Sequence, residues 1–309
     1  MNISSSKTRS FQGFSLVELL VGMAISLLVT AVAVGYMVSS SRTLTHQNNN
    51  DLIQENARFS FEILSSEFRI AGLNNTNNPN LVNTADDVKV QGLSSEKICN
   101  SDASEPTGIS SGDCNKDNLS NNSDRIAFEY ATDSVTTCNG SVVNTFSKIV
   151  SVYWVADLDN SGAGDGISSL YCQSYQSKIS PVTGDYDTFE LLGTATPLVD
   201  GIESMQVLYG VDTDGDTDPA TINTPEGDSI VNEYKKFDAI STDDRPNILS
   251  AKIGFLISGG QSIASEANTV KNEERTFVVL GETIKITDGV TRSSLSTTID
   301  FPNMPVARF

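Results

Sequence analysis

The feature that most limits how this chain can fold is an apolar stretch from Leu16 to Val38 with one acid, Glu18, near its start. At 1.5 Å per residue the stretch makes about 34 Å of helix, which is enough to span a bilayer. A carboxylate at the centre of a membrane helix costs about 2.5–3.5 kcal/mol, so such acids are rare and usually have a partner. Lys7 and Arg9 precede the stretch and favour a cytoplasmic N-terminus. The sequence therefore predicts a membrane anchor in which Glu18 has a functional role.

Three interpretations of this segment compete. A signal peptide cleaved after Ala31–Ala33 and a plain signal anchor both leave the acid unexplained. The third interpretation accounts for it: Gly13, Phe14 and Glu18 resemble the class III signal of type IV pilins, in which a short basic leader ends in Gly, Phe follows, and Glu lies four residues further on. That resemblance implies cleavage by a prepilin peptidase between Gly13 and Phe14 and methylation of the new N-terminus.

The spacing between Phe14 and Glu18 has a chemical reason. Cleavage would place a cationic amine on Phe14, and positions four apart lie one helical turn apart. The Glu18 carboxylate can therefore compensate this amine or, better, the amine of a neighbouring chain, and such pairing is strong at low dielectric. We expect Glu18 to act in assembly. No proline precedes Pro79, so the helix lacks the proline that many major pilins carry.

The chain beyond the apolar stretch continues with helical periodicity. One face is marked by apolar residues at steps of three and four, which are Ile53, Ala57, Phe61, Leu64, Phe68 and Ala71. This apolar face is widened by Leu52, Phe59, Ile63 and Ile70, and Gly72 is a suitable helix end. The face predicts a helix that packs on a sheet and keeps some apolar surface for neighbouring pilin helices.

Three segments carry a further resemblance. They are "QENARFSFEILSSEFRIAGL" after the membrane stretch, "VDGIESMQVLYGVDTDGD" in the middle, and "RSSLSTTIDFPN" near the end. All three resemble segments of PilW-type minor pilins. Glu67 stands where the family pattern usually has Asp. The resemblance implies the pilin fold, an α+β architecture in which a long N-terminal helix, membrane-spanning in its first half, packs on a mostly antiparallel β-sheet head.

The pattern of elements predicts the same class of fold. Strands are predicted at 125–131, 145–157, 167–172, 201–212, 247–258, 274–286 and 295–301. A run of strands after one helix is typical of an α+β protein. We expect four parts: a leader at 1–13, a helix at 14–73 that crosses the membrane at 16–38, an irregular region at 74–124 and a β-rich head at 125–309.

The four cysteines favour disulfides, because an exported chain with an even number and no metal-binding spacing fits that chemistry. Cys99 and Cys114 lie in a region poor in apolar residues, which a bridge would stabilise by about 3 kcal/mol. Cys138 and Cys172 flank a predicted hairpin. We therefore expect the pairs Cys99–Cys114 and Cys138–Cys172.

Two acidic segments are candidate calcium loops. The first places acids at alternate positions, Asp212, Asp214, Asp216 and Asp218. The second resembles part of an EF-hand loop, with Asp157, Asp159, Ser161 and Asp165. Both lack the acid expected at the twelfth position, and solvated acidic turns explain the same residues. Calcium is therefore a candidate ligand, and no cofactor is required.

Neither an enzyme nor a nucleic-acid-binding protein is expected. The sequence has one histidine, His46, and no nucleophile, phosphate-loop or metalloprotease motif. Its formal net charge of −19 disfavours binding to phosphate backbones.

The resemblance implies a minor pilin that lies in the inner membrane with a periplasmic head and then enters the pilus at the cell surface. Such a protein primes filament formation, lies at the pilus tip, and contacts other minor pilins, the major pilin and an adhesin-like tip protein. Two alternatives remain open: a minor pseudopilin of a type II secretion system, and a membrane-anchored calcium-binding or adhesive domain.

Overall fold

A computed structural model describes part of the chain. The described residues are 15–72, 98–99, 113–119, 122–157, 168–178, 189–213, 230–241, 244–262 and 274–302. The chain divides into two compact units, Met1–Gln47 and Asn48–Phe309, which are treated separately below.

One long helix, α1 (Leu16–Ile70), contributes to both units. It contains no proline, so its hydrogen-bond ladder is uninterrupted. The helix ends at Ile70, two residues before the predicted stop Gly72, whose φ of 77° lies in the left-handed region that glycine adopts just after helix ends. The Gly72 N–H donates to the carbonyl oxygen of Glu129 at 2.8 Å, which fastens the end of α1 to a strand.

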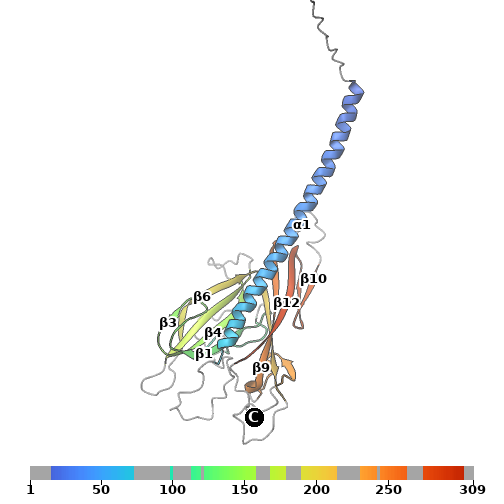
Figure 1. Ribbon diagram of the computed structural model, residues 1–309. Helices are drawn as coiled ribbons and strands as arrows, with labels where there is room; N and C mark the ends of the chain where they lie inside the picture. The colour runs from blue at the N-terminus through green and yellow to red at the C-terminus, as the bar shows by residue number, and fades with distance from the viewer. Residues whose placement is uncertain are drawn as a thin grey trace, which may run out of the picture. The chain divides into compact units, whose positions relative to one another are not determined.

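The head contains two four-stranded antiparallel sheets (Figure 1). The first has the order β1-β4-β5-β6, and its strands are β1 (Ile126–Thr132), β4 (Ser147–Ala156), β5 (Ser169–Lys178) and β6 (Glu190–Asp200). The second has the order β12-β9-β7-β8, and its strands are β7 (Ile202–Val211), β8 (Glu233–Lys235), β9 (Ile248–Ser262) and β12 (Val290–Asp300).

Smaller elements complete the described part of the head. Two antiparallel hairpins are formed by β2 (Val135–Thr136) with β3 (Val142–Val143) and by β10 (Arg275–Val279) with β11 (Glu282–Ile286). Two 3-10 helices are η1 (Phe237–Ala239) and η2 (Arg245–Asn247). The predicted α+β class, a long N-terminal helix with a mostly antiparallel head, is confirmed.

The strands differ from the sequence analysis in several places, and the short strands β2, β3 and β8 were not predicted. The run 274–286 is a hairpin rather than one strand, because Leu280 and Gly281 have φ values of 46° and 94° and turn the chain. Strand β6 was not predicted, since its sequence "ELLGTATPLVD" contains Gly and Pro and no regular alternation. Its role is to form one edge of the first sheet.

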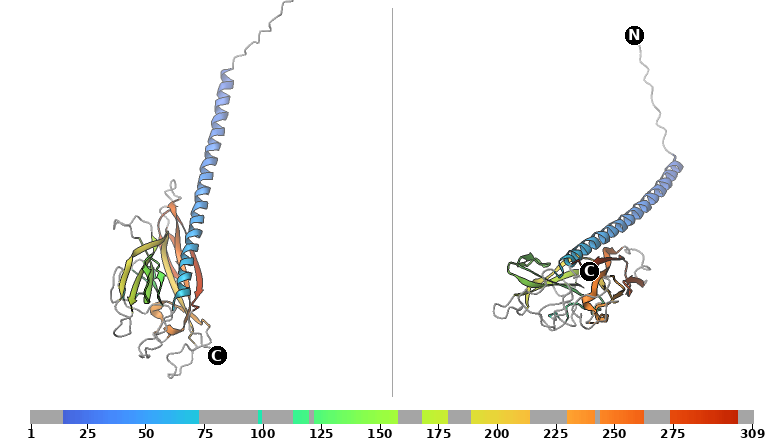
Figure 2. Two further views of the ribbon diagram at one scale, coloured as in Figure 1. Left: turned by 60° about the vertical axis from the view of Figure 1, so that its left-hand side comes forward. Right: turned by 60° about the horizontal axis from the view of Figure 1, so that its bottom comes forward.

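The main core lies where the C-terminal part of α1 meets both sheets. Phe61 contacts Phe255 of β9, with ring centroids 5.1 Å apart. Phe68 contacts Phe128 of β1 at 4.7 Å and Phe301, just after β12, at 4.6 Å. The turned views of Figure 2 show this segment of α1 beside both groups of strands. The helix therefore joins the two sheets through aromatic side chains.

The opposite face of the first sheet forms a second core. Val150, Val152 and Trp154 of β4 lie on one face and contact the bridge between Cys99 and Cys114. The first sheet is thus covered on both sides, which explains why the residues of β4 are all buried.

Candidate functional site

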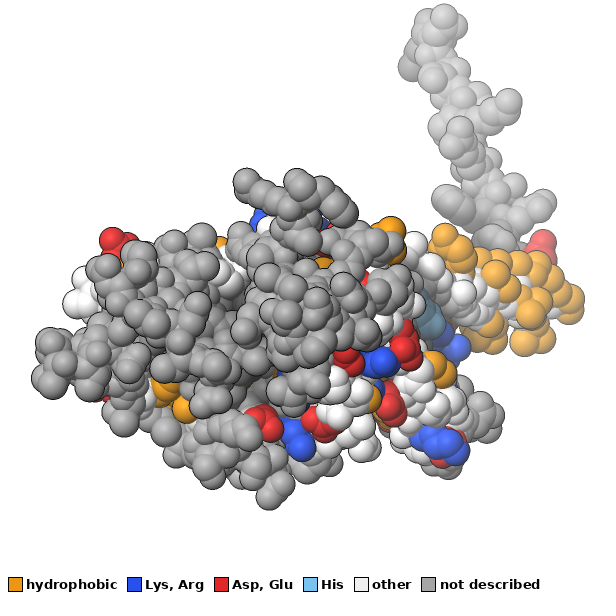
Figure 3. Space-filling model, turned by 90° about the horizontal axis from the view of Figure 1, so that it is seen from below, with side chains coloured by type: hydrophobic (Ala, Val, Ile, Leu, Met, Phe, Trp, Pro, Cys, Tyr) orange, Lys and Arg blue, Asp and Glu red, His pale blue; other side chains and the backbone are white. Residues whose placement is uncertain are grey.

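The membrane-spanning segment is the first candidate site. Every side chain from Leu16 to Val38 is exposed, and α1 contains a stretch long and apolar enough to cross a membrane. Apolar side chains gather along this segment (Figure 3). The apolar stretch begins three residues after Gly13 and two after Phe14, the residues of the expected processing signal.

Ser15 and Glu18 cap the N-terminus of α1. The Ser15 hydroxyl accepts a hydrogen bond from the Val17 N–H at 3.3 Å, and the Ser15 N–H donates to Oε2 of Glu18 at 3.1 Å. This reciprocal arrangement is a capping box, and it satisfies two N–H groups that a helix start leaves without partners. The Glu18 carboxylate therefore lies beside the backbone that directly follows Phe14. Gly13 and Phe14 themselves lie outside the described residues.

The sequence analysis missed this capping role of Glu18. The signal was present, because Ser15 and Glu18 match the S-x-x-E pattern of a capping box. Capping does not exclude pairing with an amine, since a carboxylate has two oxygens and about four acceptor sites.

The part of α1 in the second unit has an outward face with two large apolar side chains. Leu52 is 43% exposed and Phe59 is 42% exposed, and they lie seven residues apart on the same side of the helix. The guanidinium of Arg58 lies 5.6 Å from the centre of the Phe59 ring. Ile63 and Ile70, which were also expected to widen the apolar face, are half-buried and contact the cores.

Asn56 links α1 to the turn between β6 and β7. Its side-chain amide donates to the carbonyl oxygen of Asp200 at 2.8 Å. Gly201 follows with φ of 78°, and a Cβ there would lie 3.2 Å from the Asn56 amide nitrogen and 3.0 Å from the Ser258 carbonyl oxygen. Two of the segments that resemble PilW-type pilins, one containing Asn56 and one containing Gly201, are thus joined in space.

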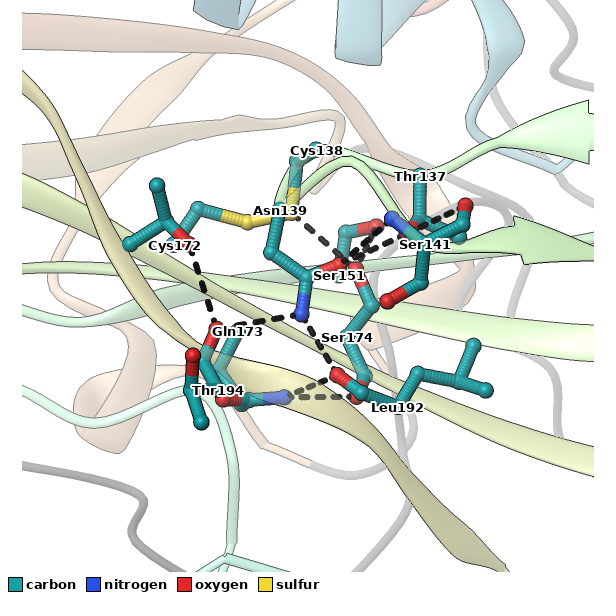
Figure 4. Close-up of a disulfide and its surroundings, with 11 residues drawn as sticks. Thr137, Cys138, Asn139, Ser141, Ser151, Cys172, Gln173, Ser174, Leu192 and Thr194 are labelled. Atoms are coloured by element: carbon teal, nitrogen blue, oxygen red, sulfur yellow. Dashed lines mark hydrogen bonds between the residues drawn. A yellow bond between two sulfur atoms is a disulfide. The ribbon is translucent and has the colours of Figure 1, made fainter.

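The bridge between Cys138 and Cys172 ties the β2–β3 hairpin to β5 (Figure 4). Their Cα atoms lie 6.2 Å apart, within the usual range for a disulfide. The Asn139 amide donates to the carbonyl oxygens of Leu192 and Thr194 of β6. The hairpin is therefore held to two strands, by a covalent bond to one and by hydrogen bonds to the other.

The bridge between Cys99 and Cys114 is held by a buried arginine. Arg125, 1% exposed, donates from Nε to the Cys114 carbonyl oxygen at 3.0 Å and from Nη2 to the Asp113 carbonyl oxygen at 2.8 Å. Burial lowers the pKa of Arg125 to about 10, so it remains charged at neutral pH. The structure brings together both cysteine pairs that the sequence analysis expected.

A polar junction connects the two sheets near η1. The buried carboxylate of Asp124 accepts the Val207 N–H at 2.8 Å and pairs with Lys236 Nζ at 3.2 Å. Asp117 accepts the Asp238 N–H at 2.7 Å. Burial raises the pKa of Asp117 to about 6, opposed in part by that hydrogen bond. Lys236 forms an ion pair with Asp124, and its positive charge also favours the ionised form of Asp117. The junction therefore has a structural role.

The candidate calcium loops lie almost wholly outside the described residues. Asp212 directly follows β7 and is buried, and Asp157 directly follows β4 and is exposed. The other six residues are not described. Within the described ranges, no group of three or more His, Cys, Asp or Glu side chains is arranged to hold a metal ion.

Comparison with known proteins gives two family matches. Residues 152–303 match the family described as Type IV Pilus-assembly protein W, and residues 8–34 match the prokaryotic N-terminal methylation motif. No curated protein and no solved structure matches the chain.

A methylation motif, one apolar helix and an antiparallel head together define a class: the chain is a membrane-anchored type IV pilin. The PilW match begins within β4 and runs through β12. Together with the methylation motif, it supports a PilW-type pilin.

Proposed function

We propose that this PilW-type pilin is a minor subunit that primes assembly of a type IV pilus and lies at the filament tip. The proposal is supported by the combination of two features in one chain. Helix α1 begins with an apolar segment whose N-terminus is capped by Glu18. The head that follows matches the pilus-assembly family. Its partners are other minor pilins, the major pilin and an adhesin-like tip protein. The head acts through protein surfaces, without enzymatic activity and without binding nucleic acid.

The structure suggests how such contacts are divided. The membrane segment carries exposed apolar side chains that suit lipid before assembly and neighbouring helices after it. In the second unit, Leu52 and Phe59 provide exposed apolar surface of their own. Both regions lie on α1, so neighbouring subunits can be bound without disturbing the sheets.

The test is a deletion strain in which surface pili and type II secretion are measured side by side. We expect loss of pili with normal secretion, restored by the parental gene. Lost secretion with normal pili would assign the chain to a secretion system as a pseudopilin. Normal pili and secretion, together with saturable calcium binding by the chain, would favour the anchored calcium-binding domain.

Processing provides a second test. Cleavage between Gly13 and Phe14 predicts that the membrane form begins with methylated Phe14 by intact-mass measurement. An N-terminus at Val34 would instead support the signal-peptide interpretation.

The role of Glu18 can be separated from membrane insertion. We expect Glu18→Ala to insert normally but to enter filaments poorly, because it removes an insertion cost and leaves a partner amine unneutralised. Ser15→Ala is the matched control, since it weakens the capping box but keeps the carboxylate. If Ser15→Ala impairs assembly as strongly as Glu18→Ala, capping rather than amine pairing explains the acid.

A further inference from the structure

Glu67 places a carboxyl group in the contact between α1 and the first sheet. The residue is 8% exposed, and its helix neighbours Leu64 and Phe68 are fully buried in the main core. Its Oε2 atom has no hydrogen-bond partner among the described residues. A buried carboxylate without full compensation is costly, so the neutral acid is favoured here.

The groups that face this carboxyl from the sheet are phenols. Tyr153 of β4 and Tyr130 of β1 are the ionisable neighbours that interact with Glu67. The Tyr153 hydroxyl lies near the carboxyl, but neither that hydroxyl nor Oε2 of Glu67 has a hydrogen-bond partner among the described residues. On α1 itself, Glu62 and Arg69 are exposed.

Among the described residues, no positively charged side chain pairs with Glu67. The buried pair of Lys148 and Glu129, with 3.5 Å between its charged atoms, lies on the opposite face of the first sheet. Burial raises the pKa of Glu67 from 4.5 to about 7, and the contact with Tyr153 lowers it only in part.

The position of Glu67 couples its charge to the end of the helix. The Ala71 N–H donates to the Glu67 carbonyl oxygen at 2.8 Å, in the last turn of α1. The next residue, Gly72, is fastened to β1 through the Glu129 carbonyl oxygen. A charge at Glu67 therefore acts on the turn that ends in this attachment.

We propose that Glu67 is a pH-sensitive latch, which holds the last turn of α1 on the first sheet while its carboxyl is neutral and loosens that turn when the carboxyl ionises. The sign follows from the raised pKa. Where the turn is detached, Glu67 regains its ordinary pKa and ionises above about pH 4.5. Stability from the docked neutral form is present in full below that pH and is lost as pH rises to about 7. The latch is independent of the tip location and of the priming role proposed above.

The test is hydrogen exchange of the Ala71 and Gly72 amides in the full chain, held in detergent micelles, between pH 6 and pH 8. After correction for the intrinsic exchange rate, we expect the opening equilibrium of this turn to rise about tenfold over that interval. Glu67→Gln should abolish the rise, because glutamine does not ionise. Glu62→Gln, on the exposed side of the same helix, is the matched control and should leave the rise unchanged.

Three results would overturn the proposal: a pH-independent wild type, a rise that persists in Glu67→Gln, or a rise abolished by Glu62→Gln. The wild-type profile decides the matter alone if Glu67→Gln does not fold. Tyr153→Phe supplies a further check, because removal of the hydroxyl should raise the pKa of Glu67 and move the rise to higher pH.

Discussion

Among the side chains of α1, the Phe68 ring should be the most costly to remove. The ring is fully buried and contacts Phe128 and Phe301, so it joins the helix to both sheets. Truncation of a buried Phe to Ala costs about 3–5 kcal/mol, and the two aromatic contacts favour the upper end of that range. A typical protein has only about 5–15 kcal/mol of stability, so Phe68→Ala removes a large share.

The matched control is Phe59→Ala on the same helix. Phe59 is 42% exposed and its described ring contact is with the Arg58 guanidinium at 5.6 Å. An exposed contact of this kind contributes about 0.5–1 kcal/mol, so this variant should lose less than about 1 kcal/mol. The two substitutions remove the same atoms, so their difference reports the burial and ring contacts of Phe68 against those of Phe59.

Urea unfolding of the full chain in detergent can measure both variants through Trp154. This is the one tryptophan of the sequence, and it is fully buried on the far face of the first sheet. With a urea slope of about 3 kcal/mol per molar, Phe68→Ala should lower the midpoint by about 1 M or more. A midpoint shift no larger than that of Phe59→Ala would refute the central position assigned to the Phe68 ring.

Three further predictions concern the head. Asn56→Ala should lose about 1 kcal/mol of unfolding free energy, because it removes the hydrogen bond to Asp200. Gly201→Ala should lose at least as much, because alanine at φ of 78° is strained and its Cβ meets the Asn56 amide. Equal urea midpoints for Gly201→Ala and wild type would contradict this account. Burial raises the pKa of Asp117 to about 6, so the stability that its neutral carboxyl contributes is present below about pH 4 and lost as pH rises to 6. Asp117→Asn should flatten that part of the pH profile of the urea midpoint. An unchanged profile would show that another group causes the slope. Replacing Cys138 and Cys172 together by Ser should cost about 3–4 kcal/mol, from a closed loop of 34 residues; non-reducing peptide mapping should recover this pair, and a cross-pair would exclude it.

The sequence alone determined the anchor, the class of fold and most strands. The apolar length of Leu16–Val38, the position of Glu18 and the three-and-four spacing from Ile53 to Ala71 are local patterns. Local patterns fix helix periodicity, helix ends and strand alternation, because those depend on neighbours within a few residues. The end of α1 just before Gly72 shows this, since a glycine after the last helical turn is a local signal.

Tertiary structure alone decided how these elements are joined. Nothing in the local pattern shows that Asn56 reaches Asp200, or that strand β6 closes an edge of the first sheet. The burial of Glu67 is of the same kind: the sequence shows an acid on a helix, and only packing against Tyr153 places it in the core. Contacts between distant residues depend on the summed packing of two sheets on one helix, and this cooperative term is not contained in any single segment.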